Sequence, residues 1–153
     1  DGFCRGKYLE NLVDQALKSK LVILSTDYAN EKSEKGVIKL YSLLLKKNIP
    51  VKVLGGLNFK YISSSSYRYA KYTFYGSHEN FYYKNIQPNV FPSNNLLKEK
   101  IKNNYIDKFS FVCNKLKKEC KIYNKDFKPL FYDTKHLTVD GYFEFGNYLK
   151  DKI

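Results

Sequence analysis

One short segment near the C-terminus carries the strongest chemical signal in the sequence. Residues 132–142 read Tyr-Asp-Thr-Lys-His-Leu-Thr-Val-Asp-Gly-Tyr, so Asp133 stands three residues before His136, one of only 2 histidines. A histidine that acts as a general base needs a partner that fixes its tautomer and stabilises the imidazolium formed during reaction. An Asp-x-x-His turn can supply that carboxylate from the same loop. The alternative is a structural hydrogen bond that fixes a loop ahead of a helix.

Helix and strand patterns alternate in the first part of the chain and predict an α/β fold. Apolar residues at helical spacing predict helices over residues 8–18 and 35–47. Residues 21–26 are a short unbroken apolar run that ends in small polar residues, which is typical of a buried parallel strand. Residues 51–56, Val-Lys-Val-Leu-Gly-Gly, predict a second buried strand. The order strand, helix, strand indicates a right-handed crossover unit in a parallel sheet.

The middle of the chain has weaker patterns. Residues 63–66 are four consecutive serines and predict a loop, and residues 67–75 predict a helix. The tyrosine-rich stretch that follows, up to Pro92, predicts an irregular connection. Ser93 is expected to cap a helix that runs to residue 103.

The C-terminal third predicts the elements that would hold the Asp-x-x-His turn. We expect a third strand over residues 108–113 and a short extended segment over 130–132. The last helix is expected over residues 139–149, with Thr138 as its cap. Its predicted core face consists of Tyr142, Phe143, Phe145 and Leu149.

The charge of the chain is strongly positive. The formal net charge is +12, and arginine occurs only at Arg5 and Arg68. Such a surface can attract an anionic partner, but bidentate recognition of phosphates and bases favours arginine over lysine. We therefore expect a lysine-rich solvated surface and no nucleic acid partner. Apolar residues make up 43% of the chain, enough for a core, and we expect a single domain over residues 1–153.

The cysteines and the lack of methionine bear on the origin of the chain. Cys113 and Cys120 lie seven residues apart and are either a disulfide or two reduced thiols. Cys4 has no obvious partner, and there is no methionine, so we expect a piece of a longer protein. Two cysteines without a nearby histidine are too few for zinc, and we expect no metal and no cofactor. No run of about 18 apolar residues predicts a membrane span.

Three segments are expected to meet at one edge of the sheet. Residues 25–28 and 55–58 follow predicted strands, and the turn with Asp133 and His136 follows the extended segment. Ligands of α/β sheets bind beyond the carboxyl ends of the strands. We therefore predict a pocket lined by small and polar groups from these segments.

The pattern Asp133-x-x-His136-Leu-Thr-x-x-Gly141 resembles the C-terminal catalytic block of the SGNH (GDSL-like) hydrolase superfamily. The layout resembles most closely the SGNH domains fused to membrane acyltransferases that O-acetylate bacterial cell-surface polysaccharides. In that branch a cysteine hairpin commonly precedes an Asp-x-x-His-Leu motif, as Cys113 and Cys120 do here. The resemblance spans residues 4–150 and is specific only from residue 113 to residue 149.

The resemblance implies a three-layer α/β/α, flavodoxin-like parallel sheet and a Ser-His-Asp triad. His136 would be the general base and Asp133 its orienting carboxylate. The family's Gly-Asp-Ser motif is not in this sequence, so we expect the first strand and its serine to lie outside this chain. Residues 25–28 stand where the family's Gly-x-Asn-Asp oxyanion block would fall, and differ from it.

The expected function is that of an esterase or O-acetyltransferase acting on acyl esters of cell-surface glycans. The expected partner is a fused or associated membrane acyltransferase domain, and the expected location is extracytoplasmic. The alternative is a non-catalytic basic module that binds an anionic glycan or nucleic acid. His78 and the serines at 63–66 are weaker site candidates, since neither has a supporting motif.

Overall fold

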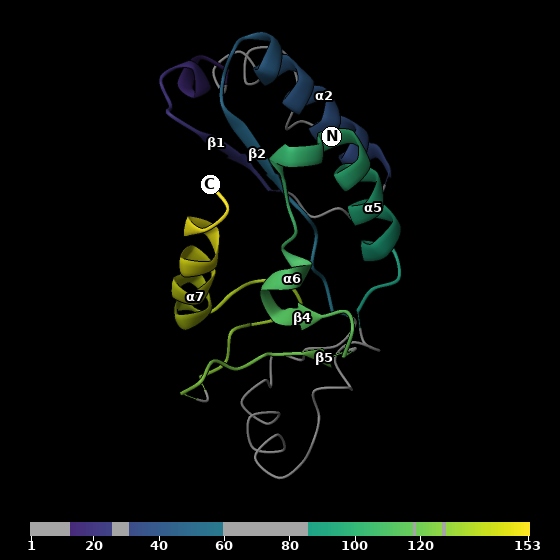
Figure 1. Cartoon of the computed structure of the whole chain (residues 1–153), viewed down its shortest axis with the longest axis vertical. Helices are drawn as coiled ribbons and strands as arrows, with labels where there is room; N and C mark the ends of the chain where they lie inside the picture. The colour runs from purple at the N-terminus through teal and green to yellow at the C-terminus, as the bar shows by residue number, and fades with distance from the viewer. Residues whose placement is uncertain (1–12, 26–30, 60–85, 118, 127) are drawn as a thin grey trace.

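The centre of the molecule is a parallel sheet, seen in a computed structural model that describes residues 13–25, 31–59, 86–117, 119–126 and 128–153. The strands are β1 (Val22–Leu24), β2 (Val51–Leu54) and β3 (Tyr105–Ile106), hydrogen-bonded in that order. Helices flank the sheet: α2 and α5 lie together on one side, and α7 stands on the other (Figure 1). The predicted α/β class with a parallel sheet is confirmed.

The elements with strong local patterns form where the sequence predicts them. Residues 13–17 are helical, and α2 (Glu31–Lys46) begins a few residues before its predicted start. β2 is the central strand, and Val53 is fully buried. β1 is different: Ile23 is 39% exposed. The prediction that this strand is buried was wrong, because within the described residues β1 pairs on one side only.

Helix α5 (Val90–Ile101) begins earlier than predicted. Its N-cap is Asn89, so the prediction of Ser93 as the cap was wrong. Pro92 is tolerated because it lies in the first turn, where backbone N–H groups have no partner within the helix. Ser93 is instead buried, and its hydroxyl bonds to the carboxylate of Glu34 on α2, which joins the two helices.

The third strand is three residues upstream of its predicted place. Residues 108–113 form the short helix α6 (Phe109–Val112) and the start of β4 (Cys113–Asn114), so the prediction of a strand there was wrong. The cause is Asp107, whose carboxylate accepts hydrogen bonds from the Phe109 N–H at 3.0 Å and the Ser110 hydroxyl at 2.9 Å. A side chain that bonds the following N–H groups favours a helical turn over an extended chain.

A small hairpin follows, and it carries the disulfide. β4 pairs antiparallel with β5 (Glu119–Cys120), and Cys113 and Cys120 are joined by a disulfide. Of the two possibilities left open by the sequence, the structure therefore has the bridged one.

The last helix, α7 (Val139–Lys150), is capped as predicted: the Thr138 hydroxyl accepts the Gly141 N–H at 3.0 Å. Phe145 faces the core, but Tyr142 is 62% and Phe143 73% exposed, so both were wrongly placed on the core face. The reason is Gly141, whose missing side chain lets the helix approach the backbone of Leu130.

Several predictions concern residues outside the described ranges. These are residues 8–12 of the helix predicted over 8–18, the loop at 63–66, the helix at 67–75, His78 and Cys4. None of the helices in the described ranges has both the length and the hydropathy that crossing a bilayer requires.

Candidate functional site

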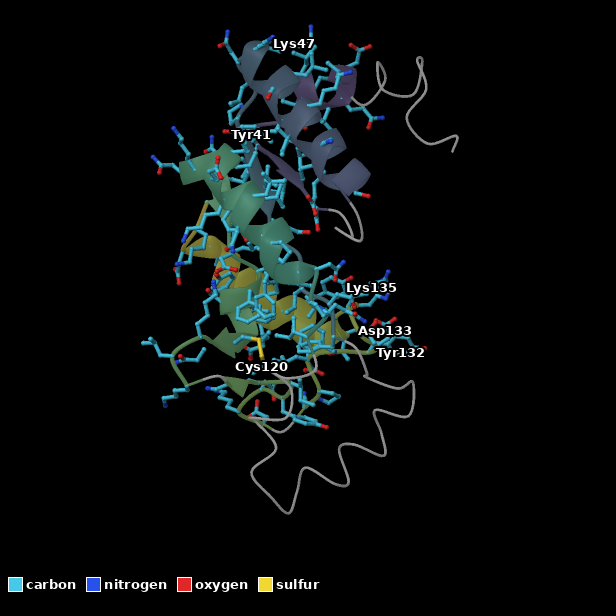
Figure 2. The ribbon with its side chains drawn as sticks, turned by 90° about the vertical axis from the view of Figure 1, so that its right-hand side faces the viewer. Tyr41, Lys47, Cys120, Tyr132, Asp133 and Lys135 are labelled. Carbon is cyan, nitrogen blue, oxygen red and sulfur yellow. A yellow bond between two sulfur atoms is a disulfide. The ribbon has the colours of Figure 1, made fainter. Side chains whose placement is uncertain are left out.

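Asp133 and His136 are in direct contact. Oδ1 of Asp133 accepts the N–H of Lys135 at 2.9 Å and that of His136 at 2.8 Å. Oδ2 of the same carboxylate lies 2.6 Å from Nδ1 of His136. One carboxylate therefore folds the turn and orients the imidazole, which leaves Nε2 as the ring nitrogen on the opposite edge. Figure 2 shows Asp133 and Lys135 close together at one edge of the molecule.

The turn is anchored on both sides by backbone hydrogen bonds. The N–H of Tyr132 donates to the carbonyl of His136 at 2.8 Å, and Phe131 and Leu137 form an antiparallel bridge. The carbonyl of Thr134 accepts the N–H of Phe59 at 2.9 Å, which ties the turn to the segment after β2. The position of the imidazole is thus set by main-chain contacts as well as by Asp133.

The charge state of Asp133 follows from its hydrogen bonds. Partial burial raises its pKa, but the bonds from the His136 ring and from the two backbone N–H groups outweigh this and hold the pKa below its ordinary value of 3.8. At neutral pH the side chain is therefore a carboxylate. Its side chain is 31% exposed, and that of His136 is 61% exposed.

His136 lies on the wall of a cleft of about 440 Å³ at the carboxyl edge of the sheet. Ser25 at the end of β1 and the loop of residues 55–58 after β2 line the same cleft, so the segments expected to converge do so as far as the structure describes them. The described lining residues are Ser25, Leu54, Gly55, Gly56, Leu57, Asn58, Asn89, Val90, Lys108, Lys135, His136, Leu137, Tyr142 and Phe145.

The loop after β2 is held by a buried amide. Asn94 of α5 accepts the N–H of Gly56 through Oδ1 at 2.7 Å and donates from Nδ2 to the Gly56 carbonyl at 2.9 Å. Gly55 has no room for a side chain, because a Cβ there would lie 2.3 Å from the Tyr105 hydroxyl. The part of the cleft wall formed by Gly55 and Gly56 is therefore backbone held in place by Asn94 and Tyr105.

The sequence reasoning missed several groups that line or support the cleft. Lys108 was assigned to a strand, Tyr142 to the core and Asn94 to an ordinary helix position. The only available signal was for Lys135, which lies inside the Asp-x-x-His motif. Within the ranges that the structure describes, no three His, Cys, Asp or Glu side chains are grouped so that they could hold a metal ion.

Comparison with known proteins gives a fold neighbour. No protein-family model matches the chain, and no curated protein matches it. Among solved structures, the chain is similar to the periplasmic domain of the lipopolysaccharide acetyltransferase of Salmonella ser. Paratyphi A, with a TM-score of 0.71 and 15% identity. The match covers 99% of this chain but only 65% of that chain. At this identity the likeness establishes the fold, and it agrees with the resemblance seen in the sequence.

Proposed function

We propose that the chain is part of an SGNH-type acyl-transfer enzyme, an esterase or O-acetyltransferase that acts on acyl esters of cell-surface glycans. The observation that carries the proposal is the 2.6 Å contact between Asp133 Oδ2 and His136 Nδ1 on the wall of a cleft. An imidazole oriented in this way through one nitrogen can take and return a proton through the other. The fold shared with an acetyltransferase domain supports the same reading.

In the proposed reaction, a serine hydroxyl attacks the carbonyl carbon of an acyl ester and His136 Nε2 takes the hydroxyl proton. Collapse of the tetrahedral intermediate breaks the ester bond, and the leaving alkoxide receives that proton from His136. The acyl group is then attached to the serine. A second hydroxyl, from water or a sugar, gives its proton to His136 and attacks the acyl-enzyme, which regenerates the serine. Asp133 stabilises the imidazolium in both halves of the reaction.

The serine is proposed to come from a strand that lies outside this chain. Two observations support this. Within the described residues, the edge of β1 that faces away from β2 has no strand beside it, and Ile23 on this strand is 39% exposed. The neighbouring acetyltransferase domain also has 35% of its length (100% minus 65%) outside the match. A parallel strand added beside β1 would end at the same edge as the cleft.

The location and the partner follow from the same proposal. The Cys113–Cys120 disulfide is favoured by an oxidising compartment, which supports an extracytoplasmic domain. For transfer to a sugar, a fused or associated membrane acyltransferase domain is proposed to supply the acyl group. Whether the acceptor is water or a sugar depends on how well the completed site excludes water.

The test uses the complete domain, expressed from the full gene with the upstream segment, and 4-nitrophenyl acetate as the substrate. His136→Ala should lower kcat/KM by about 10²- to 10⁴-fold, the typical contribution of a general base. Asp133→Asn should lower it by a comparable or smaller factor. Asp126→Asn makes the same chemical change at an exposed turn and should leave the rate within about twofold. A near-normal rate in the His136 variant would remove the proposed base.

A second arm locates the nucleophile. This chain alone should not turn over the ester if the serine lies upstream. Ser25 is the described serine that lines the cleft with His136, so Ser25→Ala is made in both the short and the complete forms. Turnover by the short form that is lost in the Ser25 variant would place the nucleophile in this chain and refute the upstream serine.

A further inference from the structure

The described side chains on the wall of the cleft are either basic or uncharged. Within the described residues the lining includes Lys108, Lys135 and His136, and it includes no Asp or Glu side chain. The two lysines come from distant parts of the sequence: Lys108 precedes α6, and Lys135 lies inside the Asp-x-x-His turn. A cleft with charges of one sign and low-dielectric walls concentrates the field and attracts the opposite charge.

Each lysine has at least one contact that restricts its position. Both are only partly exposed. The backbone of Lys135 is fixed by its N–H bond to Asp133, at 2.9 Å. The Lys108 ammonium lies 5.9 Å from the centroid of the Phe145 ring, which also lines the cleft. An ammonium has three N–H donors, so each lysine can keep its contacts within the protein and still bind a ligand.

Two described carboxylates close to these lysines in the sequence have other partners, Asp133 and Asp107. Asp133 bonds the imidazole and the two backbone N–H groups of its own turn. Asp107, next to Lys108 in the sequence, accepts from Phe109 and Ser110 and lies 3.7 Å from the Lys115 ammonium. Neither carboxylate is among the described residues that line the cleft.

The remaining lining suits a sugar. The carboxamides of Asn58 and Asn89 can bond hydroxyl groups, and the Tyr142 ring, 62% exposed, offers a flat apolar surface. These groups line the same cleft as the imidazole.

We propose that the cleft selects glycans that carry an anionic group, a carboxylate or a phosphate, near the reacting oxygen, and that Lys108 and Lys135 bind this group. The inference rests on the proposed function for the identity of the reacting oxygen, but binding itself needs no serine and can be measured on this chain. An anion held by two ammonium groups would place the neighbouring sugar hydroxyl or ester beside His136.

The binding test uses calorimetry with trigalacturonate and with its methyl ester, which keeps the sugar backbone but removes the charges. Trigalacturonate should bind at least about tenfold more tightly, and its affinity should fall as salt rises. Mannose 6-phosphate, compared with mannose, reports whether phosphate serves as well as carboxylate. A six-residue oligothymidylate tests nucleic acid. Equal affinity for the acid and its ester, no binding of either, or tighter binding of the oligonucleotide would overturn the proposal.

Matched variants separate the cleft from the overall charge. Lys108→Gln and Lys135→Gln should each weaken trigalacturonate binding by about 3- to 10-fold. The double variant Lys98→Gln/Lys100→Gln removes two charges from the exposed surface of α5, away from the cleft, and should change the affinity less than twofold. A loss in this control as large as in the cleft variants would show that only net charge matters.

The inference and the proposed function can fail separately. His136→Ala should abolish ester turnover in the complete domain but leave the affinity of this chain for trigalacturonate within about threefold, because the anion is proposed to bind to the two lysines and not to the imidazole. Selective binding without any turnover by the complete domain would refute the enzyme and keep the anionic ligand. Turnover without selectivity for charged glycans would refute the anionic ligand and keep the enzyme.

Discussion

Replacing Gly141 by alanine tests how α7 is seated against the segment that leads into the Asp-x-x-His turn. A Cβ at this position would lie 2.0 Å from the carbonyl oxygen of Leu130 and 2.9 Å from its carbonyl carbon. These are backbone atoms, so the helix or the segment must move. Gly146, five residues further along α7, would have nothing within 4 Å of an added Cβ. The two glycines are therefore a matched pair within one helix.

The expected magnitudes differ in sign. Alanine in place of glycine in a helix interior stabilises by about 1 kcal/mol. At Gly146 this is the whole effect. At Gly141 the overlap with backbone atoms costs about 3 kcal/mol, the upper end of the range for overpacking. The net change for Gly141→Ala is then a loss of about 2 kcal/mol, and the two variants should differ by about 3 kcal/mol.

The assay is urea unfolding followed by circular dichroism, with thermal unfolding as a second readout. For a chain of this size the Tm should fall by about 4–8 °C in Gly141→Ala and rise by about 2–4 °C in Gly146→Ala. Equal stabilisation of both variants would show that α7 does not approach Leu130 closely, and the explanation for the exposure of Tyr142 and Phe143 would be wrong.

Three further predictions concern groups that support the site. Asn94→Ala should destabilise by about 1–3 kcal/mol, because it leaves the N–H and the carbonyl of the partly buried Gly56 without their partner, whereas the same change at its exposed neighbour Asn95 should cost under about 0.5 kcal/mol; equal urea midpoints would contradict this. Replacing Cys113 and Cys120 together by serine should cost about 2 kcal/mol from the short loop that they close, measured against the oxidised wild type, and an unchanged midpoint would mean that the bridge is absent in solution. Because the pKa of Asp133 is lowered on folding, its stabilisation is present at pH values above 3.8 and is lost as the pH falls through the folded-state pKa. The difference in unfolding free energy between wild type and Asp133→Asn should therefore shrink on acidification, and a difference that grows would reverse the sign of the argument.

The parts of the fold that depend on local pattern were predictable. α2 repeats apolar residues at helical spacing, and β2 is a short apolar run closed by glycines. The cap of α7 joins Thr138 to a residue three positions later. In each case the partners are close in sequence, so the residue types alone indicate the structure.

The third strand shows where local pattern fails. The apolar run at 108–113 suits a strand or a short helix equally well, and periodicity cannot separate them. The outcome depends on Asp107, which bonds the next turn, and on the pairing of Ile106 with Leu54, 52 residues earlier. A pairing over that distance leaves no mark in the sequence of the strand itself.

The candidate site also combines contacts between residues close in sequence with contacts between distant segments. The contact of Asp133 with His136 is a bond between residues three apart, closed by a turn that the carboxylate itself folds, and for that reason the sequence alone was enough to determine it. Only the tertiary structure decided that Lys108 would face the same cleft and that Asn94 would hold its wall, because these groups come from segments far apart in the chain. The packing of Gly141 on Leu130, and with it the exposure of Tyr142, was decided by the approach of two backbones, which no pattern of side chains encodes.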